Sequence, residues 1–517
     1  MVLLRSIITV SSYTMISRLL GFVRDVLVAA FLGAGPIADA FFVAFKIPNF
    51  FRRLFAEGAF SAAFVPLFAA KLTDEGRSSA LQFSSAVLSV MVVFVFVFVT
   101  ILQILMPWLM YLFAPGFANE PIKFSLAVEL TRITFPYLLF ISLVSILGGV
   151  LNSLGRFAAA AATPIILNIT LIAMLLLATP HLLSAGHSLA WGVFLAGILQ
   201  FIWLIYICRR EGFLLRLPMP RMSPSLRRLL KLVAPGVFGA GVVQINLLVD
   251  VVIASLLPTG AISFLYYADR VYQLPLGVVG VAIGTALLPV LSRQLRNGEE
   301  IEALTSTNRA IEMALLLTIP ATAALLVISQ PIVNVLFERG VFNSAATVST
   351  SHALVAYATG LPAFVLIKVL TPSFFARQDT STPVKIAVAC VFVNLILNLT
   401  LMQILAHVGI ALATSISAWI NVCLLVFFLY LRGQFKIDKR LRQKGLRIIF
   451  ASLGMAFSLW AALSYFHTFQ IVGQGSRACM LAMLVFGGLG VYLFLVILFR
   501  AVEIHEIKKL LKSDSAD

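Results

Sequence analysis

Apolar runs long enough to cross a bilayer recur from one end of this sequence to the other. Two examples are "VLSVMVVFVFVFVTILQILM" at 87–106 and "MLVFGGLGVYLFLVILF" at 483–499. A transmembrane helix needs about 17 to 25 predominantly apolar residues, and both runs have that length. The composition agrees, because 61% of the 517 residues are hydrophobic and only 11% are charged, whereas soluble domains carry charge on about a quarter of their residues. We therefore predict an all-α polytopic membrane protein.

Hydropathy along the chain predicts about fourteen transmembrane helices. The first begins near residue 7 and shows no small-residue cleavage site after it, so we interpret it as a span and not as a removable signal. The predicted spans are 7–32, 37–66, 81–108, 126–150, 160–180, 187–207, 229–257, 262–291, 308–330, 349–375, 384–405, 408–431, 446–466 and 478–500.

Positive charge is distributed unevenly between the two sides of these spans. Odd-numbered connections such as "GAGP", "APGFANEPIK" and "LPTG" contain few Lys and Arg residues, whereas even-numbered ones contain many. The positive-inside rule then places both termini in the cytoplasm. Attraction to anionic lipid accounts for the net charge of +17 better than binding to nucleic acid does.

The first twelve spans form an internal repeat. The stretch "GPIADAFFVAFKIP" resembles "GAISFLYYADRVYQLP", Pro136 corresponds to Pro362, and "ILNITL" with Asn168 corresponds to "ILNLTL" with Asn398. All pairs have a similar offset of roughly 220 to 230 residues, and six spans is an even number, so we predict two parallel six-helix halves around a central cavity. The predicted regions are an N-lobe at 1–216, a C-lobe at 217–440, and two further spans with a cytoplasmic tail at 441–517.

Charged residues lie inside several predicted spans, where a charge that faces lipid is costly. Transporters with repeated halves bind substrate near the middle of the membrane, so we expect these charges to line the cavity. On the second span Arg52 is about 100° away from the charged stripe, but Pro48 can kink the helix and change that register. The charged residues are Arg18, Arg24, Asp25, Asp39, Lys46, Arg52, Arg53 and Glu57 in the first half, and Asp250, Asp269, Arg270 and Lys368 in the second.

Structural roles compete with cavity roles at several of these positions. Arg53 and Lys368 can snorkel to the interface, and Asp25 can neutralise a neighbouring Arg. Adjacent residues diverge on a helix, so we expect Asp269 and Arg270 to have separate partners. Asn168 and Asn398 are typical of hydrogen bonds between helices.

Arginine dominates the predicted cavity. Guanidinium groups match phosphate and pyrophosphate oxygens and stay charged when dehydrated, whereas an exporter of cationic drugs needs acidic or aromatic walls. We therefore predict an anionic substrate.

Four stretches of the sequence are distinctive: "SRLLGFVRDVLVAAFLGAG", "ADAFFVAFKIPNFFRRLFAEGAFSAAFVP", "YYADRVYQLPLGVVGVAIGTALLPVLS" and "FFARQDTSTPVKIA". They closely resemble the MurJ (MviN) family of lipid II flippases, which belongs to the superfamily of multidrug, oligosaccharidyl-lipid and polysaccharide exporters. The resemblance extends over essentially the whole chain. It implies that the protein moves lipid II, the undecaprenyl-pyrophosphate-linked peptidoglycan precursor, from the cytoplasmic to the periplasmic leaflet of the bacterial inner membrane.

The resemblance also implies roles for individual residues. Arg24, Arg52 and Arg270 would hold the pyrophosphate and sugar head group, while Asp39 and Glu57 would balance or gate these charges. The last two spans would form a groove for the isoprenoid tail. The candidate substrate-binding residues are Ser17, Arg18, Arg24, Asn49, Arg52, Ser263 and Arg270, and the candidate gating residues are Asp25, Asp39, Glu57 and Asp269.

The energy source is open, because the sequence contains no ATP-binding phosphate loop. We expect no cofactor, no metal centre and a functional monomer, driven by Na⁺, by H⁺ or by the membrane potential. Asp250 with Asn394, Asn398 and Thr400 could supply oxygen ligands to Na⁺ or take up a proton, or Asp250 could pair with a cavity base. The alternatives are an ion-coupled exporter of drugs or other polyprenyl lipids, and an intramembrane enzyme, for which the short loops provide no acid, base or metal constellation.

Overall fold

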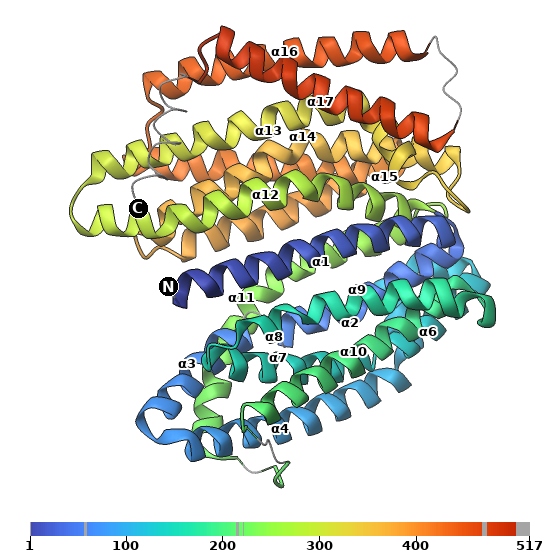
Figure 1. The fold of residues 1–517 in the computed structure, drawn as a ribbon, viewed down its shortest axis with the longest axis vertical. Coiled ribbons are helices and arrows are strands. Elements are labelled where there is room, and N and C mark those ends of the chain that lie inside the picture. The colour runs from blue at the N-terminus through green and yellow to red at the C-terminus, as the bar shows by residue number, and fades with distance from the viewer. Residues whose placement is uncertain (1, 56–58, 214–216, 221, 468–472, 503–517) are drawn as a thin grey trace. The chain divides into compact units, whose positions relative to one another are not determined.

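The computed structural model describes residues 2–55, 59–213, 217–220, 222–467 and 473–502, and all regular structure in these ranges is helical (Figure 1). Large apolar side chains such as Phe94, Phe96, Phe486 and Phe494 are exposed. Exposed apolar surface of this extent is expected where lipid is the solvent. The predicted all-α polytopic class is therefore confirmed.

The described chain packs as two compact units, of which the first comprises Met1–Ser263 and Arg339–Phe342. Its helices are α1 (Val2–Leu32), α2 (Pro36–Phe55), α3 (Ala59–Asp74), α4 (Gly76–Ile104), α5 (Met106–Phe113), η1 (Pro115–Asn119), α6 (Pro121–Thr134), α7 (Tyr137–Ser153), α8 (Phe157–Ala161), α9 (Thr163–Ala173), η2 (Met174–Ala178), η3 (Thr179–His181), α10 (Ala185–Arg210) and α11 (Pro224–Ser255).

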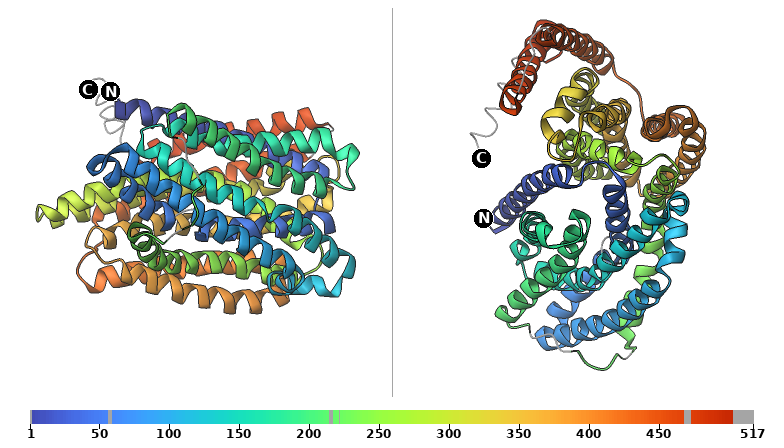
Figure 2. Two further views of the ribbon diagram at one scale, coloured as in Figure 1. Left: turned by 90° about the horizontal axis from the view of Figure 1, so that it is seen from below. Right: turned by 90° about the vertical axis from the view of Figure 1, so that its right-hand side faces the viewer.

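The second unit comprises Phe264–Glu338 and Asn343–Asp517. Within it α13, α14 and α15 pack in succession, and α16 and α17 pack on one another and on α13 (Figure 2). Its helices are α12 (Ala261–Arg296), whose first three residues belong to the first unit, α13 (Glu300–Phe337), α14 (Ser344–Phe375), α15 (Ser381–Leu431), α16 (Lys439–His467) and α17 (Gln474–Leu498).

The two units are defined by which helices pack together, whereas the predicted lobes are defined by the sequence repeat, so their boundaries differ. Helix α11 packs on α2 and α3 and so belongs to the first unit, although the repeat assigns it to the second lobe. The lobe boundaries at 216 and 440 remain predictions.

Nine helical segments in the described ranges are long and apolar enough to span a membrane. Helices α1 and α2 are not among them; α2 carries Asp39, Arg52 and Arg53 in its first and last turns. One of the nine, Ser381–Leu431, includes two predicted spans. The class is thus established, while the number fourteen remains a prediction.

Helix α15 reverses direction inside its 51 residues. Ala406 has φ 50°, a conformation that is costly for a residue with a Cβ, and a Cβ on Gly409 would collide with the Leu401 carbonyl. On a straight helix residues eight apart are separated by about 12 Å along the axis, so this contact requires a tight turn. The turn joins the two spans predicted at 384–405 and 408–431.

Proline interrupts another predicted span. The span predicted at 126–150 consists of α6 and α7, which are separated at Phe135 and Pro136. Proline lacks an N–H and clashes with the preceding turn, which explains the break. The span predicted at 37–66 corresponds to α2 and α3, and residues 56–58 between them lie outside the described ranges.

The two predicted repeats have ion pairs at equivalent positions, with the acidic and basic residues exchanged. Arg156 contacts Glu211 at 3.0 Å in the first unit, and Asp379 contacts Arg432 at 2.6 Å in the second, at positions about 220 residues later. Hydrogen bonds from Thr382 and Arg432 hold the pKa of Asp379 well below its ordinary value. Both pairs tie the beginning of the fifth span of a half to the end of the sixth.

The last two helices are fastened to α13 along their length. Leu459, Leu484 and Tyr492 form an apolar core with Ile328 of α13, and the Tyr492 hydroxyl donates to the Leu316 carbonyl at 2.6 Å. Ion pairs lie at both ends of this packing. At one end Glu312 pairs with Arg309, Arg440 and Lys444, and Asp438 pairs with Arg309. At the other end Glu338 pairs with Arg477.

Candidate functional site

Asp39 lies at the centre of a buried polar network in the first unit. It is in the first turn of α2 and is 1% exposed. Its carboxylate accepts hydrogen bonds from Gly260 N at 2.7 Å, Ser263 N at 3.0 Å and Ser263 Oγ at 2.6 Å. Because the first N–H groups of a helix lack partners within it, Asp39 caps the start of α12 from another helix. The structure thus brings together two residues that the sequence placed in one site.

Lys123 completes this network and was not predicted. Its Nζ lies 3.3 Å from Asp39 Oδ2 and 3.5 Å from Glu120 Oε1, and it donates to Thr259 Oγ1 at 3.0 Å. The lysine is 3% exposed and its ammonium stands over the Phe117 ring. A buried charge needs a partner, so Lys123 and Asp39 depend on one another. The sequence held one indication that Lys123 is unusual: it is a lysine in "APGFANEPIK", a connection otherwise poor in basic residues.

A second polar group joins α1 to α9. Arg24 donates to Asp25 Oδ1 from Nε at 3.0 Å and from Nη2 at 2.7 Å, and its Nη1 donates to Asn168 Oδ1 at 2.9 Å. Asn168 Nδ2 donates to the Ser17 carbonyl at 2.9 Å. Asp25 therefore neutralises its neighbour, and Asn168 forms the hydrogen bonds between helices that the sequence indicated. Arg18 is exposed on the same helix.

The charged end of α2 is arranged around Asn49. This residue donates to the Phe45 carbonyl at 2.8 Å and accepts from Arg52 Nε at 3.1 Å. Arg52 is half-buried, whereas Lys46 and Arg53 are exposed. Glu57 lies outside the described residues.

Arg270 in the second unit is held against residues of its own helix. Its guanidinium stands over the Tyr266 ring at 4.8 Å, and Nη2 lies 3.6 Å from Asp269 Oδ2. Gln273 also donates to Asp269. The expectation that Asp269 and Arg270 diverge was wrong, because a long guanidinium side chain can fold back along the helix to its neighbour.

The candidate ion-site residues are divided between the units. Asp250 lies half-buried on α11 in the first unit. Asn394 and Asn398 are buried on α15 in the second, where Asn398 Nδ2 donates to Asn394 Oδ1 at 3.0 Å. Thr400 is exposed and donates to the Ile396 and Leu397 carbonyls of its own helix. The side chain of Lys368 passes Gly280 of α12, so the lysine stem packs between helices.

The three candidate arginines share one chemical property. Arg24 and Arg52 donate hydrogen bonds to the side chains of Asn168 and Asn49, and the Arg270 guanidinium stands over the Tyr266 ring at 4.8 Å. A planar fork with a fixed direction is suited to bidentate contact with phosphate oxygens, and fixing it before binding reduces the entropy lost on binding.

Known proteins resemble this chain along most of its length. A family model described as lipid II flippase MurJ matches residues 28–477. A probable lipid II flippase MurJ from Rhizobium meliloti (strain 1021) is 44% identical over 498 residues, which cover 95% of this chain and 93% of that protein. A solved lipid II flippase MurJ in an inward closed conformation has TM-score 0.79 and 30% identity, covering 95% of this chain and 99% of its own. An inward-facing multidrug MATE transporter of the MOP superfamily, at 13% identity and TM-score 0.66 over 82% of this chain and 97% of its own, shares the fold.

Proposed function

The chain belongs to the MurJ family of lipid II flippases, and from that premise we propose that it moves lipid II from the cytoplasmic to the periplasmic leaflet of the bacterial inner membrane. The observation that carries this proposal is the family match over residues 28–477. The substrate is an isoprenoid pyrophosphate attached to a glycopeptide, so its head is anionic and polar while its tail is apolar. Members of this family are transporters and not enzymes.

The head group is bound by the guanidinium groups of Arg24, Arg52 and Arg270. One observation supports this assignment: each guanidinium lies beside a side chain that contacts it, Asn168 for Arg24, Asn49 for Arg52 and Tyr266 for Arg270. Three cationic forks offer enough donors for the pyrophosphate oxygens. Supporting contacts to the head group come from Ser17, Arg18, Asn49 and Ser263.

The acidic residues control the cycle. Asp39 bonds the start of α12 and Lys123 together, and breaking this network would release α12 for a rocking movement in an alternating-access cycle. Asp25 and Asp269 moderate the charge of Arg24 and Arg270. Glu57 has the same role. The protein acts as a monomer, with both termini cytoplasmic and with the isoprenoid tail in a groove formed by α16 and α17.

Depletion of the protein in cells tests the function directly. We expect lipid II to accumulate in the cytoplasmic leaflet, because the polar head cannot cross the hydrocarbon unaided. The measurement is the fraction of lipid II that a membrane-impermeant lipid II-binding probe reaches from outside. That fraction should fall while total lipid II rises, and an unchanged fraction would refute the proposal.

Energy coupling gives a further prediction. If Asp250 with Asn394, Asn398 and Thr400 binds Na⁺ or takes up H⁺, Asp250→Asn should slow translocation by roughly tenfold or more and remove its dependence on that ion gradient. Sodium and proton gradients are collapsed one at a time in vesicles of both proteins. Equal dependence of both proteins on the gradients would exclude Asp250 from coupling and favour the membrane potential.

A further inference from the structure

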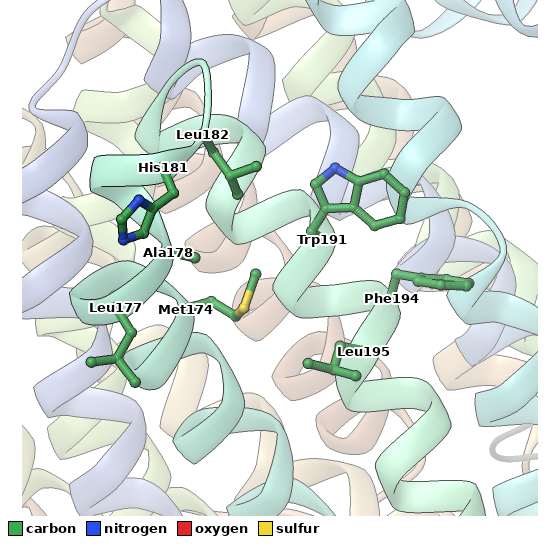
Figure 3. A pocket seen from close by; sticks show the side chains of 8 residues that line it. All are labelled: Met174, Leu177, Ala178, His181, Leu182, Trp191, Phe194 and Leu195. Carbon is green, nitrogen blue, oxygen red and sulfur yellow. The ribbon is translucent and has the colours of Figure 1, made fainter.

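A groove on the surface of the first unit joins an apolar pocket to a polar one. The apolar pocket has a volume of about 580 Å³ and is lined by η2, η3 and α10, including Met174, Leu177, Trp191 and Leu195 (Figure 3). In Figure 3 Leu182 and Trp191 stand toward one end of this pocket and Leu195 toward the other. The polar pocket, of about 440 Å³, also includes Leu182 and Trp191, so the two adjoin.

Arg132 of α6 is a charged residue that lines this groove although it lies within a predicted membrane span. It lines the polar pocket and is exposed, yet it lies about six residues, or roughly 9 Å, inside the span predicted at 126–150. In the described part of the chain the guanidinium forms no ion pair, and only the main-chain carbonyl of Arg132 accepts a hydrogen bond, from Gln103. A lipid-facing charge at this depth is costly unless an anion meets it. Arg132 therefore requires a partner from the bilayer.

His187 provides a second, independent indication. Its side chain is 9% exposed and lines the same pocket. Ser184 Oγ lies 2.8 Å from Nδ1, while the buried Nε2 has no hydrogen-bond partner among the described residues. If the Ser184 hydroxyl donates to Nδ1, then Nε2 carries the proton and presents it to the pocket. A buried donor without a partner costs free energy, so a ligand acceptor is expected there.

Glu129 adds an acceptor one turn nearer the beginning of α6. Its Oε1 lies 3.3 Å from His187 Nε2, outside hydrogen-bonding geometry, and its side chain is 54% exposed. Glu129 and Arg132 are three positions apart on one helix face, yet no ion pair between them occurs in the described structure. From the beginning of α6 inward, the groove thus presents a carboxylate, then two cationic or N–H donors, then an apolar cavity.

We propose that this groove binds one phospholipid of the surrounding bilayer whose head group contains both a phosphate and a primary ammonium. The phosphate is bound by Arg132 and His187, the ammonium by Glu129, and one acyl chain fills the cavity beside Trp191. The order of the protein groups matches the order of the lipid groups, because the ammonium of such a lipid lies outward of its phosphate. A cavity of this size suits an acyl segment, and a Trp at the interface is typical of a lipid-facing surface.

Charge complementarity separates this occupant from other phospholipids. A head group with a phosphate alone would leave Glu129 facing a like charge. A choline head group has no N–H to donate to the Glu129 carboxylate. The proposal concerns binding alone and is independent of the translocated substrate, so failure of either proposal leaves the other standing.

Quenching of Trp191 tests the lipid site. The full-length protein with Trp191 as its single tryptophan (Trp108→Phe, Trp203→Phe, Trp419→Phe, Trp460→Phe) is reconstituted in phosphatidylcholine. Lipids with brominated acyl chains and phosphoethanolamine, phosphoglycerol or phosphocholine head groups are titrated in. We expect half-maximal quenching by the phosphoethanolamine lipid at a roughly fivefold to tenfold lower mole fraction than by the other two. Arg132→Gln and Glu129→Gln should each remove this preference.

The control is Arg209→Gln, an exposed arginine at the other end of α10, which should retain the preference. Equal quenching by all three lipids in the parent protein would mean ordinary boundary lipid and would overturn the site. Stronger quenching by phosphoglycerol would exclude the role of Glu129, and a preference that persists in Arg132→Gln would exclude the phosphate contact. The parent titration decides the proposal even if a variant fails to fold.

Discussion

Arg270→Ala is expected to reduce lipid II translocation by roughly a hundredfold or more, because truncating a charged group that pairs with a desolvated partner costs about 2 to 5 kcal/mol and about 1.4 kcal/mol is a factor of ten. Arg24→Ala and Arg52→Ala should have effects of similar size. The measurement is translocation of lipid II by each purified variant in vesicles, normalised to inserted protein.

Arg270 is the cleanest of the three positions for this test. Its side chain is 37% exposed, against 12% for Arg24, so its loss should change stability less. Arg24 also holds Asp25 and Asn168, and its replacement therefore combines loss of binding with a structural cost. The melting temperature of each variant separates these two effects.

Two matched variants separate the effect of the planar guanidinium on translocation from the effect of its charge and position. Arg270→Lys keeps the charge but loses the planar fork, so it should recover part of the activity. Arg53→Ala removes an exposed arginine of α2 next to Arg52 and should retain near-normal translocation. Normal translocation by all three alanine variants would refute the assignment of the head-group site.

The fold class could be predicted because it depends on a long-range average. Twenty apolar residues can satisfy their backbone in lipid only as a helix, and this holds at every span whatever the neighbours are. Local interruptions depend on single residues: Pro136 ends a helix, and Ala406 takes a positive φ in a turn that hydropathy does not register.

The candidate site could be predicted in part, since a charge inside a span is conspicuous in a sequence. Asp39 and Ser263, both of which the resemblance offered as candidates, are joined by a hydrogen bond. Lys123 was missed because it lies in a connection, where a lysine ordinarily points to water, and only the fold reveals that it is buried beside Asp39. For Asp269 and Arg270 the sequence predicted a separation that the structure does not show. Helix geometry describes where the Cβ atoms point, whereas a long side chain can bend back to its neighbour.

Lys123→Met is expected to destabilise the protein by about 3 to 5 kcal/mol, because it leaves the buried Asp39 carboxylate without its cation. Asp39→Asn should destabilise it by a similar amount through the ammonium that remains. The double variant replaces the pair by neutral groups, and we expect it to recover most of the lost stability. Unfolding of the purified proteins, followed across a double-mutant cycle, measures the coupling between the two residues.

Stability and transport should separate in this cycle if the pair controls the movement of α12. The double variant keeps one amide oxygen, which can accept from Ser263 in place of Asp39 Oδ1 but does not replace the second oxygen that accepts from Gly260. The start of α12 therefore stays partly capped, while the Asp39–Lys123 ion pair is gone. We therefore expect near-normal unfolding with translocation still reduced by roughly tenfold, the equivalent of about 1.4 kcal/mol of lost coupling. Lys71→Met is the matched control, because its ion pair with Glu75 is a solvent-exposed i,i+4 pair that should contribute less than about 1 kcal/mol. Additive destabilisation in the double variant would show that the two residues are not coupled, and full recovery of transport together with stability would show that the pair is structural alone.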